Sequence, residues 1–289
     1  MPRPDVSVIL PAYKARETLP RALASILRCG LPAGQIEVVL ASDDGCDHRD
    51  LVPPGLPVSV TPVGPVATGP GAARNRALQQ ARGEFIAFLD ADDSWEPGYL
   101  SALLPLARRH GAAFGATSVL EGEQQILRLP EGRHQLTLED LGAEGASFHP
   151  VLPRSQARPF TSHLSQDVRH AVELLARLGG RAPLGHRAYQ LRLGMTSVTA
   201  AAGFSARVSR AYRSHIAEIE AGVGDIPFAL RPACAEVFRA KARLNDSYCL
   251  DARPKESFYA FIARTRDRGA LPGTTRCRAA AATAGLAAS

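Results

Sequence analysis

The stretch EFIAFLDADDSW, residues 84–95, runs from an apolar strand pattern directly into three carboxylates within four positions. Asp90, Asp92 and Asp93 are close enough to raise one another's pKa, which costs stability unless a cation or water lies among them. Alternate residues of an extended chain point to one side, so Asp90 and Asp92 can direct their carboxylates to one point, with Asp93 turned towards the following helix. Such oxygen ligands suit Mg²⁺ or Mn²⁺. A loop or a helix cap is the other account of the triplet.

Strand and helix patterns alternate around this stretch. The continuous apolar runs at 6–10 and 37–42 are typical of parallel strands buried on both faces, and the prolines of PVSVTPV (57–63) favour an edge strand. A further strand is predicted at 84–89, and helices are predicted at 17–28, 71–81 and 96–109. This order predicts an α/β fold, with a Rossmann-like, mainly parallel sheet and helices on both of its faces.

Polar and turn residues follow three of these strands, and ligands of such sheets bind outside the carboxyl ends of the strands. The residues are Pro11, Ala12 and Tyr13 after the first strand, Asp43, Asp44 and Gly45 after the second, and Asp90, Ala91, Asp92 and Asp93 after the fourth. We therefore expect these three groups to converge on one edge of the sheet. Acidic side chains that meet there favour a cation site over a solvated surface.

The second half of the chain has a different pattern. Short strands and a small helix are predicted from about 111 to 155, then a helix near 166–178 and a strand over 182–193. Beyond residue 199 the pattern is helical, with segments near 199–220, 228–250 and 255–268. The tail, 271–289, is low in complexity, and we predict that it is disordered.

The composition is that of an ordinary globular protein, with 45% hydrophobic and 21% charged residues among 289. No window approaches the roughly 18 apolar residues of a membrane span, and the N-terminus has no signal-peptide pattern, so we expect a cytoplasmic protein. The net charge of +6 is carried almost entirely by arginine. No basic stripe alternates with aromatic residues, so we expect no nucleic-acid partner, whereas diphosphates or an acidic membrane surface fit this charge.

Four motifs occur in a fixed order: SVILPAY (7–13), VVLASDDG (38–45), GPGAARNRAL (69–78) and GEFIAFLDADD (83–93). Together they closely resemble the N-terminal half of the family 2 glycosyltransferases of GT-A fold. Those enzymes transfer a sugar from a nucleotide diphosphate to an acceptor, with inversion at the anomeric carbon. The resemblance is close over residues 5–110 and looser over 145–200. It implies a GT-A domain over 1–200, with a donor-binding half (1–110), an acceptor half (111–200) and a helical extension over 201–270.

The resemblance also implies a donor site. Pro11, Ala12 and Tyr13 would form its first loop, with the Tyr13 ring stacked on the nucleotide base, although a plain turn aromatic is the other account of Tyr13. Asp44 would accept a hydrogen bond from the base, which in this family is commonly uracil. We interpret Asp43 as a loop or capping residue.

The remaining donor residues lie in the third and fourth motifs. Gly71, Arg74 and Asn75 would lie on a helix that packs under the donor, where Arg74 could also neutralise the acidic cluster. Asp90 and the adjoining Ala91 would contact the ribose or the metal. Asp92 would be the direct ligand of Mn²⁺ or Mg²⁺, which would stabilise the departing diphosphate as a Lewis acid.

Inversion requires a base that deprotonates the acceptor hydroxyl. In the resembling family this base is an Asp at the start of a helix, which a Gly-Gly turn and a Tyr-x-x-Arg strand follow. Asp167 of SQDVRHAVELLARLGG (165–180) has that position, and Gly179, Gly180, Tyr189, Arg192, Ser197 and Thr199 follow in register. Gln166 replaces the usual Glu, and Arg158-Pro159-Phe160 replaces a Gly-Gly-Phe element. The other account of Asp167 is a favourable charge at a helix N-terminus.

Other accounts remain for several aromatic and basic residues. Trp95 would either stack on an acceptor sugar or anchor the next helix. His149, His163 and His186 could each supply a further metal or phosphate contact, and the other account, which we favour, is that they are structural residues. The arginines of the C-terminal helices would either touch the inner surface of a membrane or form a solvated basic face.

The function predicted from the sequence is transfer of a sugar from a nucleotide sugar, foremost a UDP-sugar, to a glycan or a lipid-linked saccharide. The pattern leaves the sugar, the linkage and the oligomeric state open. A nucleotidyltransferase would need a glycine-rich loop after the first strand, which PAYKARETL (11–19) lacks. A catalytically silent relative that binds a nucleotide sugar or a protein partner is the alternative, because Gln166 and the Phe160 region depart from the family pattern.

Overall fold

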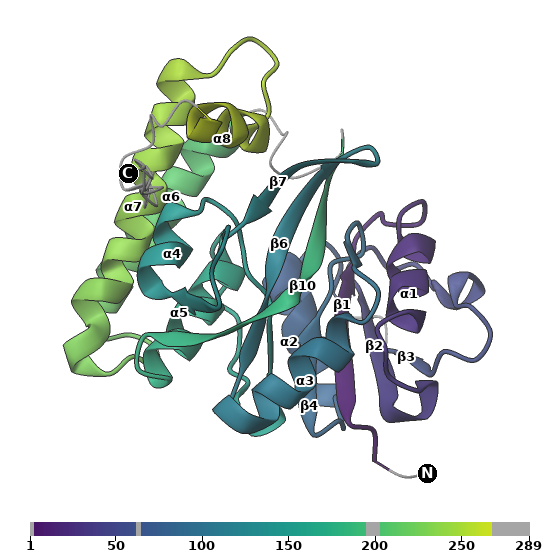
Figure 1. Cartoon of the computed structure of the whole chain (residues 1–289). Helices are drawn as coiled ribbons and strands as arrows, with labels where there is room; N and C mark the ends of the chain where they lie inside the picture. The colour runs from purple at the N-terminus through teal and green to yellow at the C-terminus, as the bar shows by residue number, and fades with distance from the viewer. Residues whose placement is uncertain (1–2, 62–64, 195–202, 268–289) are drawn as a thin grey trace, which may run out of the picture.

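The computed structural model describes residues 3–61, 65–194 and 203–267, and Figure 1 shows the arrangement of its elements. The strands are β1 Val6–Ala12, β2 Ile36–Ser42, β3 Val58–Val60, β4 Phe85–Phe88, β5 Ser94–Trp95, β6 Ala113–Glu121, β7 Gln124–Leu129, β8 Gln135–Thr137, β9 Pro150–Pro153 and β10 Arg181–Leu193. The α-helices are α1 Leu19–Leu27, α2 Pro70–Gln80, α3 Tyr99–His110, α4 Leu138–Ala143, α5 Gln166–Arg177, α6 Phe204–Glu220, α7 Arg231–Asp251 and α8 Phe258–Asp267.

One mixed sheet runs through the molecule in the order β3-β2-β1-β4-β9-β6-β10-β5, with β7 beside β6 and β8 beside β10. The pairs β1–β2, β1–β4, β2–β3 and β6–β10 are parallel. Since β9 is antiparallel to both β4 and β6, the two parallel groups run in the same direction. The predicted α/β fold with a mainly parallel sheet is confirmed, with the antiparallel strands β5, β7, β8 and β9 added to it.

The apolar runs of the first half are buried on both faces, as their composition predicts. Neighbouring residues of β1 belong to opposite cores: Val8 and Leu10 pack with Leu23 of α1 and Leu103 of α3, whereas Ile9 packs on the other face. The Ile9 face is covered by α2, α5 and α7, through apolar residues such as Ala73, Val172 and Val237. A strand enclosed in this way needs no alternation of polar side chains, which is why its sequence is continuously apolar.

The predicted helical C-terminal region is present as α6, α7 and α8. Helix α7 packs along α6 and against α4, and the buried Arg169 of α5 secures this layer. Arg169 donates from Nε to Glu173 at 2.7 Å and from Nη2 to the carbonyl oxygen of Val223, beyond α6, at 2.6 Å. The expected helix start at 199–202 and the tail after residue 267 lie outside the described residues.

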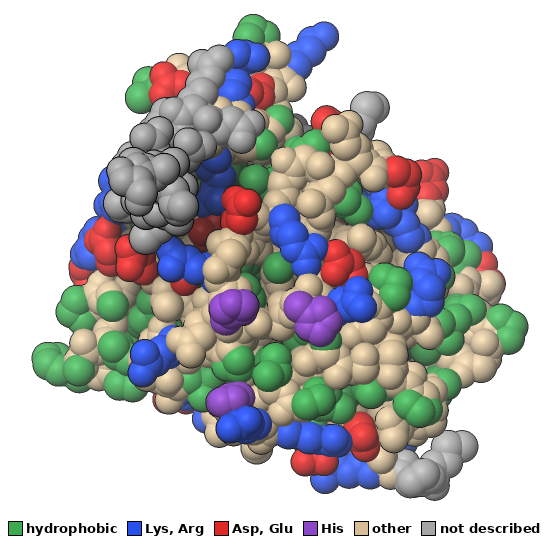
Figure 2. All heavy atoms as spheres, viewed as in Figure 1, with side chains coloured by type: hydrophobic (Ala, Val, Ile, Leu, Met, Phe, Trp, Pro, Cys, Tyr) green, Lys and Arg blue, Asp and Glu red, His purple; other side chains and the backbone are tan. Residues whose placement is uncertain are grey.

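Charges of both signs are interleaved on the surface of the C-terminal helices, as Figure 2 shows for one face of the molecule. Arg239 and Arg243 of α7 form ion pairs with Glu220 and Glu236. No helix within residues 3–61, 65–194 and 203–267 combines the length and the apolar character needed to cross a bilayer.

A buried histidine makes the stability of this fold depend on pH. The His170 ring stacks on Phe160 at 4.4 Å between centroids and meets Phe88 edge-on at 5.4 Å. Burial, reinforced by the charge of Arg177, lowers the pKa of His170 from 6.5 to about 3. Below pH 6.5, His170 therefore binds a proton in the unfolded chain but not in the folded chain. The free energy of unfolding decreases as the pH falls from 6.5 towards 3.

We expect this histidine to lower the free energy of unfolding by about 2 kcal/mol between pH 8 and pH 5. The variant His170→Phe removes the titrating group and should reduce the measured pH slope by that amount. Urea unfolding at both pH values measures the slope, with His186→Asn as the control for loss of one exposed imidazole. An unchanged slope in His170→Phe would show that His170 does not cause the acid sensitivity.

Candidate functional site

The first two sequence motifs meet at the carboxyl ends of β1 and β2. Pro11 and Ala12 end β1, and Tyr13 projects from the next turn with 51% of its surface exposed. The Asp44 carboxylate accepts hydrogen bonds from the backbone N–H groups of Lys14 at 2.6 Å and Cys46 at 3.0 Å. Burial alone would raise the pKa of Asp44, but these N–H groups lower it to about 2. Asp44 thus stays ionised and ties the two loops together, while Tyr13 is free to stack on a ligand.

Asp43 holds the entry to α2, as its interpretation as a loop or capping residue predicts. Its carboxylate accepts hydrogen bonds from the N–H groups of Thr68 at 3.1 Å and Gly69 at 2.8 Å. Arg76 of α2 donates to the same carboxylate at 3.0 Å. With 3% of its surface exposed, Asp43 is a structural residue of the loop before α2.

Arg74 is the buried cation of the site. It projects from α2 with 2% of its surface exposed, pairs with the Asp90 carboxylate, and its guanidinium lies 5.4 Å from the centre of the Phe160 ring. Burial alone would lower the pKa of Arg74, but the charges of Asp90 and then Asp167 outweigh it, so the pKa is raised. The expected neutralising role of Arg74 is consistent with its pairing with Asp90, and Arg74 interacts with the charges of two aspartates from different halves of the chain.

Asn75 and Gly71 join α2 to the segment before α5. The Asn75 amide donates to the carbonyl oxygen of Phe160 at 2.9 Å and accepts from its N–H at 2.8 Å. A β-carbon on Gly71 would lie 2.6 Å from the carbonyl oxygen of Thr161, so only glycine fits. Both residues therefore support the site from beneath, and the Asn75 side chain forms its hydrogen bonds with the protein backbone.

The three aspartates of the triplet differ in exposure: Asp93 is bound inside the protein, whereas Asp90 and Asp92 are at least partly exposed. Asp93 is buried, and its carboxylate accepts from the Tyr189 hydroxyl at 2.8 Å and from the N–H of Arg192 at 2.8 Å. The Tyr189 hydroxyl in turn accepts from the N–H of Asp90 at 3.0 Å. The expectation that Asp93 turns towards the following helix is wrong. Asp93 turns to β10, because its two hydrogen-bond donors, the Tyr189 hydroxyl and the Arg192 N–H, are on that strand.

The Asp93 anchor leaves Asp90 half-buried and Asp92 exposed. Burial of Asp93, together with the charges of Asp92 and Asp90, raises its pKa well above the ordinary value. The carboxyl tip of Asp92 reaches solvent, yet the surrounding protein and the charge of Asp90 raise its pKa as well. A cation beside Asp90 and Asp92 would relieve this repulsion. Among the described residues, no three His, Cys, Asp or Glu side chains form a complete metal-binding group.

Asp167 lies in the first turn of α5, and its charge acts on the Arg74 guanidinium, as the charge of Asp90 does. Burial alone would raise its pKa, but the Arg74 guanidinium, with His149 and the Ser147 hydroxyl, lowers it. The Gly-Gly turn that ends α5 is confirmed, because Gly179 and Gly180 both have positive φ angles, 78° and 90°. The acceptor-half pattern thus folds as expected as far as Arg192, whereas Ser197 and Thr199 lie outside the described residues.

The aromatic residues around the triplet are structural. Trp95 is buried, with 1% of its surface exposed, and stacks on Tyr99 of α3 at 4.9 Å, so it anchors that helix. His149 is buried and its ring lies 4.4 Å from that of Tyr189. The part of Tyr189 and His149 in supporting the triplet was not predicted, because each is more than 50 residues away in sequence.

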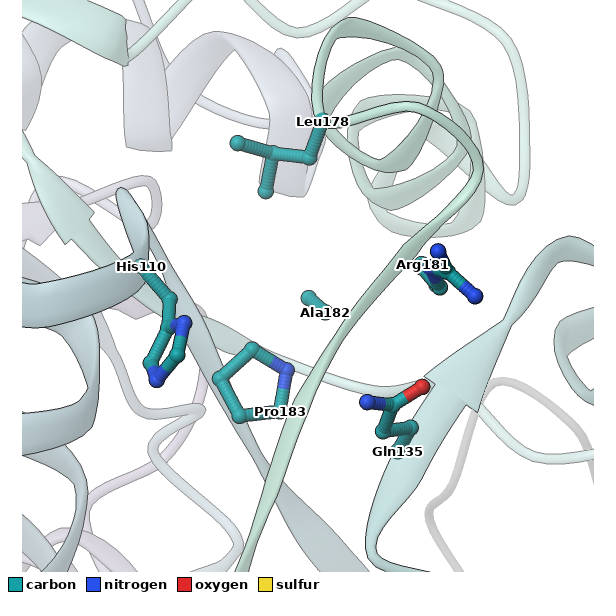
Figure 3. A pocket seen from close by; sticks show the side chains of 6 residues that line it. All are labelled: His110, Gln135, Leu178, Arg181, Ala182 and Pro183. Carbon is teal, nitrogen blue, oxygen red and sulfur yellow. The ribbon is translucent and has the colours of Figure 1, made fainter.

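A separate hollow of about 200 Å³ lies near the start of β10, at the edge of the sheet opposite the aspartates. Figure 3 shows its lining, which is His110, Gln135, Leu178, Arg181, Ala182 and Pro183. The lining contains no carboxylate, so this hollow lacks the oxygen ligands that a hydrated divalent cation prefers. The chemistry-bearing residues are gathered at the carboxyl ends of the strands instead.

Comparisons with known proteins agree with this geometry. Residues 7–138 match the sequence model of the family described as "Glycosyl transferase family 2". The succinoglycan biosynthesis protein ExoO of Rhizobium meliloti is 31% identical over 148 residues, which is 47% of this chain and 41% of that protein. The Escherichia coli enzyme WfgD, a UDP-Glc:α-D-GlcNAc-diphosphoundecaprenol β-1,3-glucosyltransferase, is 31% identical over 38% of this chain and 43% of its own length. The matched part of this chain therefore spans less than half of each of these relatives.

Solved structures share the fold over nearly the whole chain. TarS residues 1–349 from Staphylococcus aureus, in complex with UDP-GlcNAc, superpose with a TM-score of 0.67 at 18% identity, covering 93% of this chain and 82% of that one. The mannosyltransferase PcManGT from Pyrobaculum calidifontis, in complex with GDP-Man and Mn²⁺, gives 0.52 at 17% identity, covering 93% and 81%. The GT-A-like fold expected from the sequence is thus confirmed.

The Tyr189 bridge gives a testable contribution to the site. The variant Tyr189→Phe keeps the ring against His149 but leaves the Asp93 carboxyl and the N–H of Asp90 without their shared partner. We expect the free energy of unfolding to fall by about 1–3 kcal/mol, the cost of leaving buried polar groups unpaired. Urea unfolding measures it, and Tyr13→Phe, at an exposed ring, is the control. Equal stability of Tyr189→Phe and the wild type would show that the bridge contributes nothing.

Proposed function

We propose that this chain is a member of glycosyl transferase family 2 that transfers a sugar from a nucleotide-diphosphate sugar to a hydroxyl of a glycan or lipid-linked saccharide, with inversion. The observation that carries the proposal is that the buried Arg74 forms an ion pair with Asp90 and also interacts with the charge of Asp167. One buried cation thereby brings the predicted donor residues close to the predicted base. A transferase needs that closeness, because donor and acceptor must meet with their reacting atoms about 3 Å apart.

The donor would bind across the carboxyl ends of β1, β2 and β4. Tyr13 has an exposed ring for a nucleobase, and Asp44 remains ionised beside it. Pro11, Ala12 and Ala91 would line this surface, with Asn75 and Gly71 beneath it. We favour a UDP-sugar because TarS is solved with UDP-GlcNAc and the E. coli relative is named for UDP-Glc.

The residues present fit a divalent cation, Mn²⁺ or Mg²⁺. Asp92 would ligate it directly and Asp90 would share it, with further oxygens from water and the diphosphate, as Mg²⁺ prefers. Burial and then the charge of Asp90 raise the pKa of Asp92, and a cation beside the two carboxylates would offset that cost of ionisation. When bound, the cation would stabilise the negative charge of the departing diphosphate.

Asp167 would act as the base. Its lowered pKa keeps the carboxylate ionised at neutral pH, so that it can accept the proton of the attacking hydroxyl. Its place at the start of α5 puts its charge at the favourable end of the helix dipole. The Arg74 guanidinium would hold both carboxylates in position while the donor and acceptor bind.

The acceptor is proposed as a glycan or a lipid-linked saccharide. The E. coli relative is named for a diphosphoundecaprenol acceptor and TarS for poly(ribitol-phosphate). With a lipid-linked acceptor, the chain would work at the surface of a membrane, and the exposed arginines of α6 are suited to anionic headgroups.

Nucleotide binding tests the donor site. Thermal unfolding is measured with UDP, GDP and dTDP and their sugars, each with and without Mn²⁺. We expect stabilisation by the uracil nucleotides that needs the metal, and loss of that stabilisation in Asp92→Asn, because a neutral amide is a poor ligand. Asp246→Asn, at an exposed position of α7, is the matched control. If no nucleotide stabilises the wild type, the donor site is wrong.

A second variant separates transfer from donor binding. Asp167→Asn should keep the metal-dependent stabilisation by UDP but lower the rate of transfer about 10²–10⁴-fold, the usual contribution of a general base. The rate is measured as UDP released in the presence of lipid-linked or glycan acceptors. Transfer by Asp167→Asn at the wild-type rate would remove Asp167 from the mechanism. Nucleotide binding without transfer in the wild type would favour the alternative, a catalytically silent relative. The buried Gln166 supports that alternative, because it replaces the usual Glu.

A further inference from the structure

The C-terminal helices hold a short stretch of the acceptor half, residues 144–149, hereafter the 144–149 segment. It links α4 to β9, and α7 and α8 pack beside it (Figure 1). Three contacts fix its first half. The Glu144 carboxylate pairs with Arg266 of α8, and the carbonyl oxygen of Ala146 accepts from the Lys241 ammonium of α7 at 3.0 Å.

The third contact is a close approach at Gly145. A β-carbon there would lie 2.5 Å from Ile262 of α8 and 2.8 Å from Leu244 of α7, and the φ angle of Gly145 is 73°. Only glycine meets both conditions without strain. The 144–149 segment is therefore packed against both helices, and its path depends on them.

Lys241 is an unusual residue for this role. It is 3% exposed, and the other two lysines of the chain, Lys14 and Lys255, are at exposed positions. Its hydrogen bond to Ala146 joins positions 95 apart in sequence. A buried ammonium is costly unless its charge is balanced. The balancing charges near it are those of Asp167 and Glu144.

The second half of the same segment borders Asp167. Ser147 and His149 are among the groups that lower the pKa of Asp167. The carbonyl oxygen of Ser147 accepts from the Thr117 hydroxyl of β6 at 2.7 Å, and the His149 ring packs on Tyr189. The neighbours of Asp167 are thus held by the sheet on one side and by α7 and α8 on the other.

We propose that Lys241, supported by Arg266, is a positioning residue for Asp167: it fixes the 144–149 segment so that Ser147 and His149 are held beside that carboxylate. The C-terminal helices then belong to the acceptor side of the site rather than forming a separate appendage. The catalytic consequence rests on the proposed function, whereas the positioning itself does not. Burial lowers the pKa of Lys241 to about 8, and the charge of Asp167 opposes that fall, which agrees with the closeness of the two groups.

The test uses Lys241→Met, which keeps the length of the apolar stem but removes the ammonium. The matched control is Arg243→Met, two residues on in α7 and exposed. Arg266→Met is the second variant, in case Lys241→Met fails to fold cooperatively. Hydrogen–deuterium exchange of peptides covering the 144–149 segment is compared with exchange in β1 and β2.

We expect about tenfold faster exchange in the 144–149 segment of Lys241→Met, with exchange in β1 and β2 unchanged. The substitution removes the hydrogen bond to Ala146 and the interactions of the ammonium with Asp167 and Glu144. In the transfer assay kcat should fall about tenfold, with an unchanged KM for the nucleotide sugar. Exchange and kcat equal to those of Arg243→Met would overturn the proposal. So would faster exchange with unchanged kcat, since the segment would then not act on the base.

A third readout keeps the two proposals distinguishable. If the wild type transfers no sugar, the proposed function fails, and the carboxyl titration of ¹³C-labelled Asp167, assigned with Asp167→Asn, decides the positioning. In Lys241→Met the pKa of Asp167 should then be higher by about one, because a cation and the ordered Ser147 are lost. An Asp167 titration identical in Lys241→Met and the wild type would overturn the positioning as well.

Discussion

The burial of Arg74 is the constraint on which the rest of the site depends. A guanidinium with 2% of its surface exposed needs carboxylates around it, since an unpaired buried charge is strongly destabilising. Asp90 comes from the end of β4 and Asp167 from the start of α5, 77 positions later. Both halves of the chain must therefore close around α2 for the charge of Arg74 to be balanced, while its Nε and Nη1 atoms stay buried without a hydrogen-bond partner. The face of the Phe160 ring, held in turn by Asn75, completes this enclosure.

The hydrogen bond from Tyr189 to Asp93 is a second constraint, because it determines which carboxylates of the acidic triplet are exposed. The hydroxyl of Tyr189 donates to Asp93 and accepts from the backbone of Asp90, so one side chain of β10 fixes both ends of the turn. Asp92 then has no buried partner to turn to and reaches the surface. The acidic triplet of the sequence thus consists of two carboxylates that are at least partly exposed, followed by one buried structural carboxyl, a division that spacing alone does not reveal.

Much of the donor half could be predicted because its signals are local. Buried parallel strands are continuously apolar, and residues at their carboxyl ends must share an edge, which brings Tyr13, Asp44 and Asp90 to one side without any knowledge of long-range contacts. The strand β9 was not predicted, because four residues with a proline at each end give no periodic signal. It nevertheless joins the two parallel groups through its pairing with β4 and β6.

The direction of Asp93 was mispredicted for a related reason. Its partners are 96 and 99 positions away, so the alternation of an extended chain could not indicate them. The same limit applies to the contacts of Lys241, whose partner Ala146 is 95 positions away.

The charges of the site explain why its parts are coupled. The charges of Asp90, Asp92 and Asp167 all interact with one buried cation, Arg74, and the exposed Arg21 donates to a backbone oxygen of Asp92. Ionisation of all three carboxylates leaves the cluster with excess negative charge, and Asp93 avoids adding to it because burial raises its pKa. A divalent cation held by Asp92 and Asp90 would offset part of that excess. Near Asp167, the buried ammonium of Lys241 is a positive charge that the C-terminal helices supply.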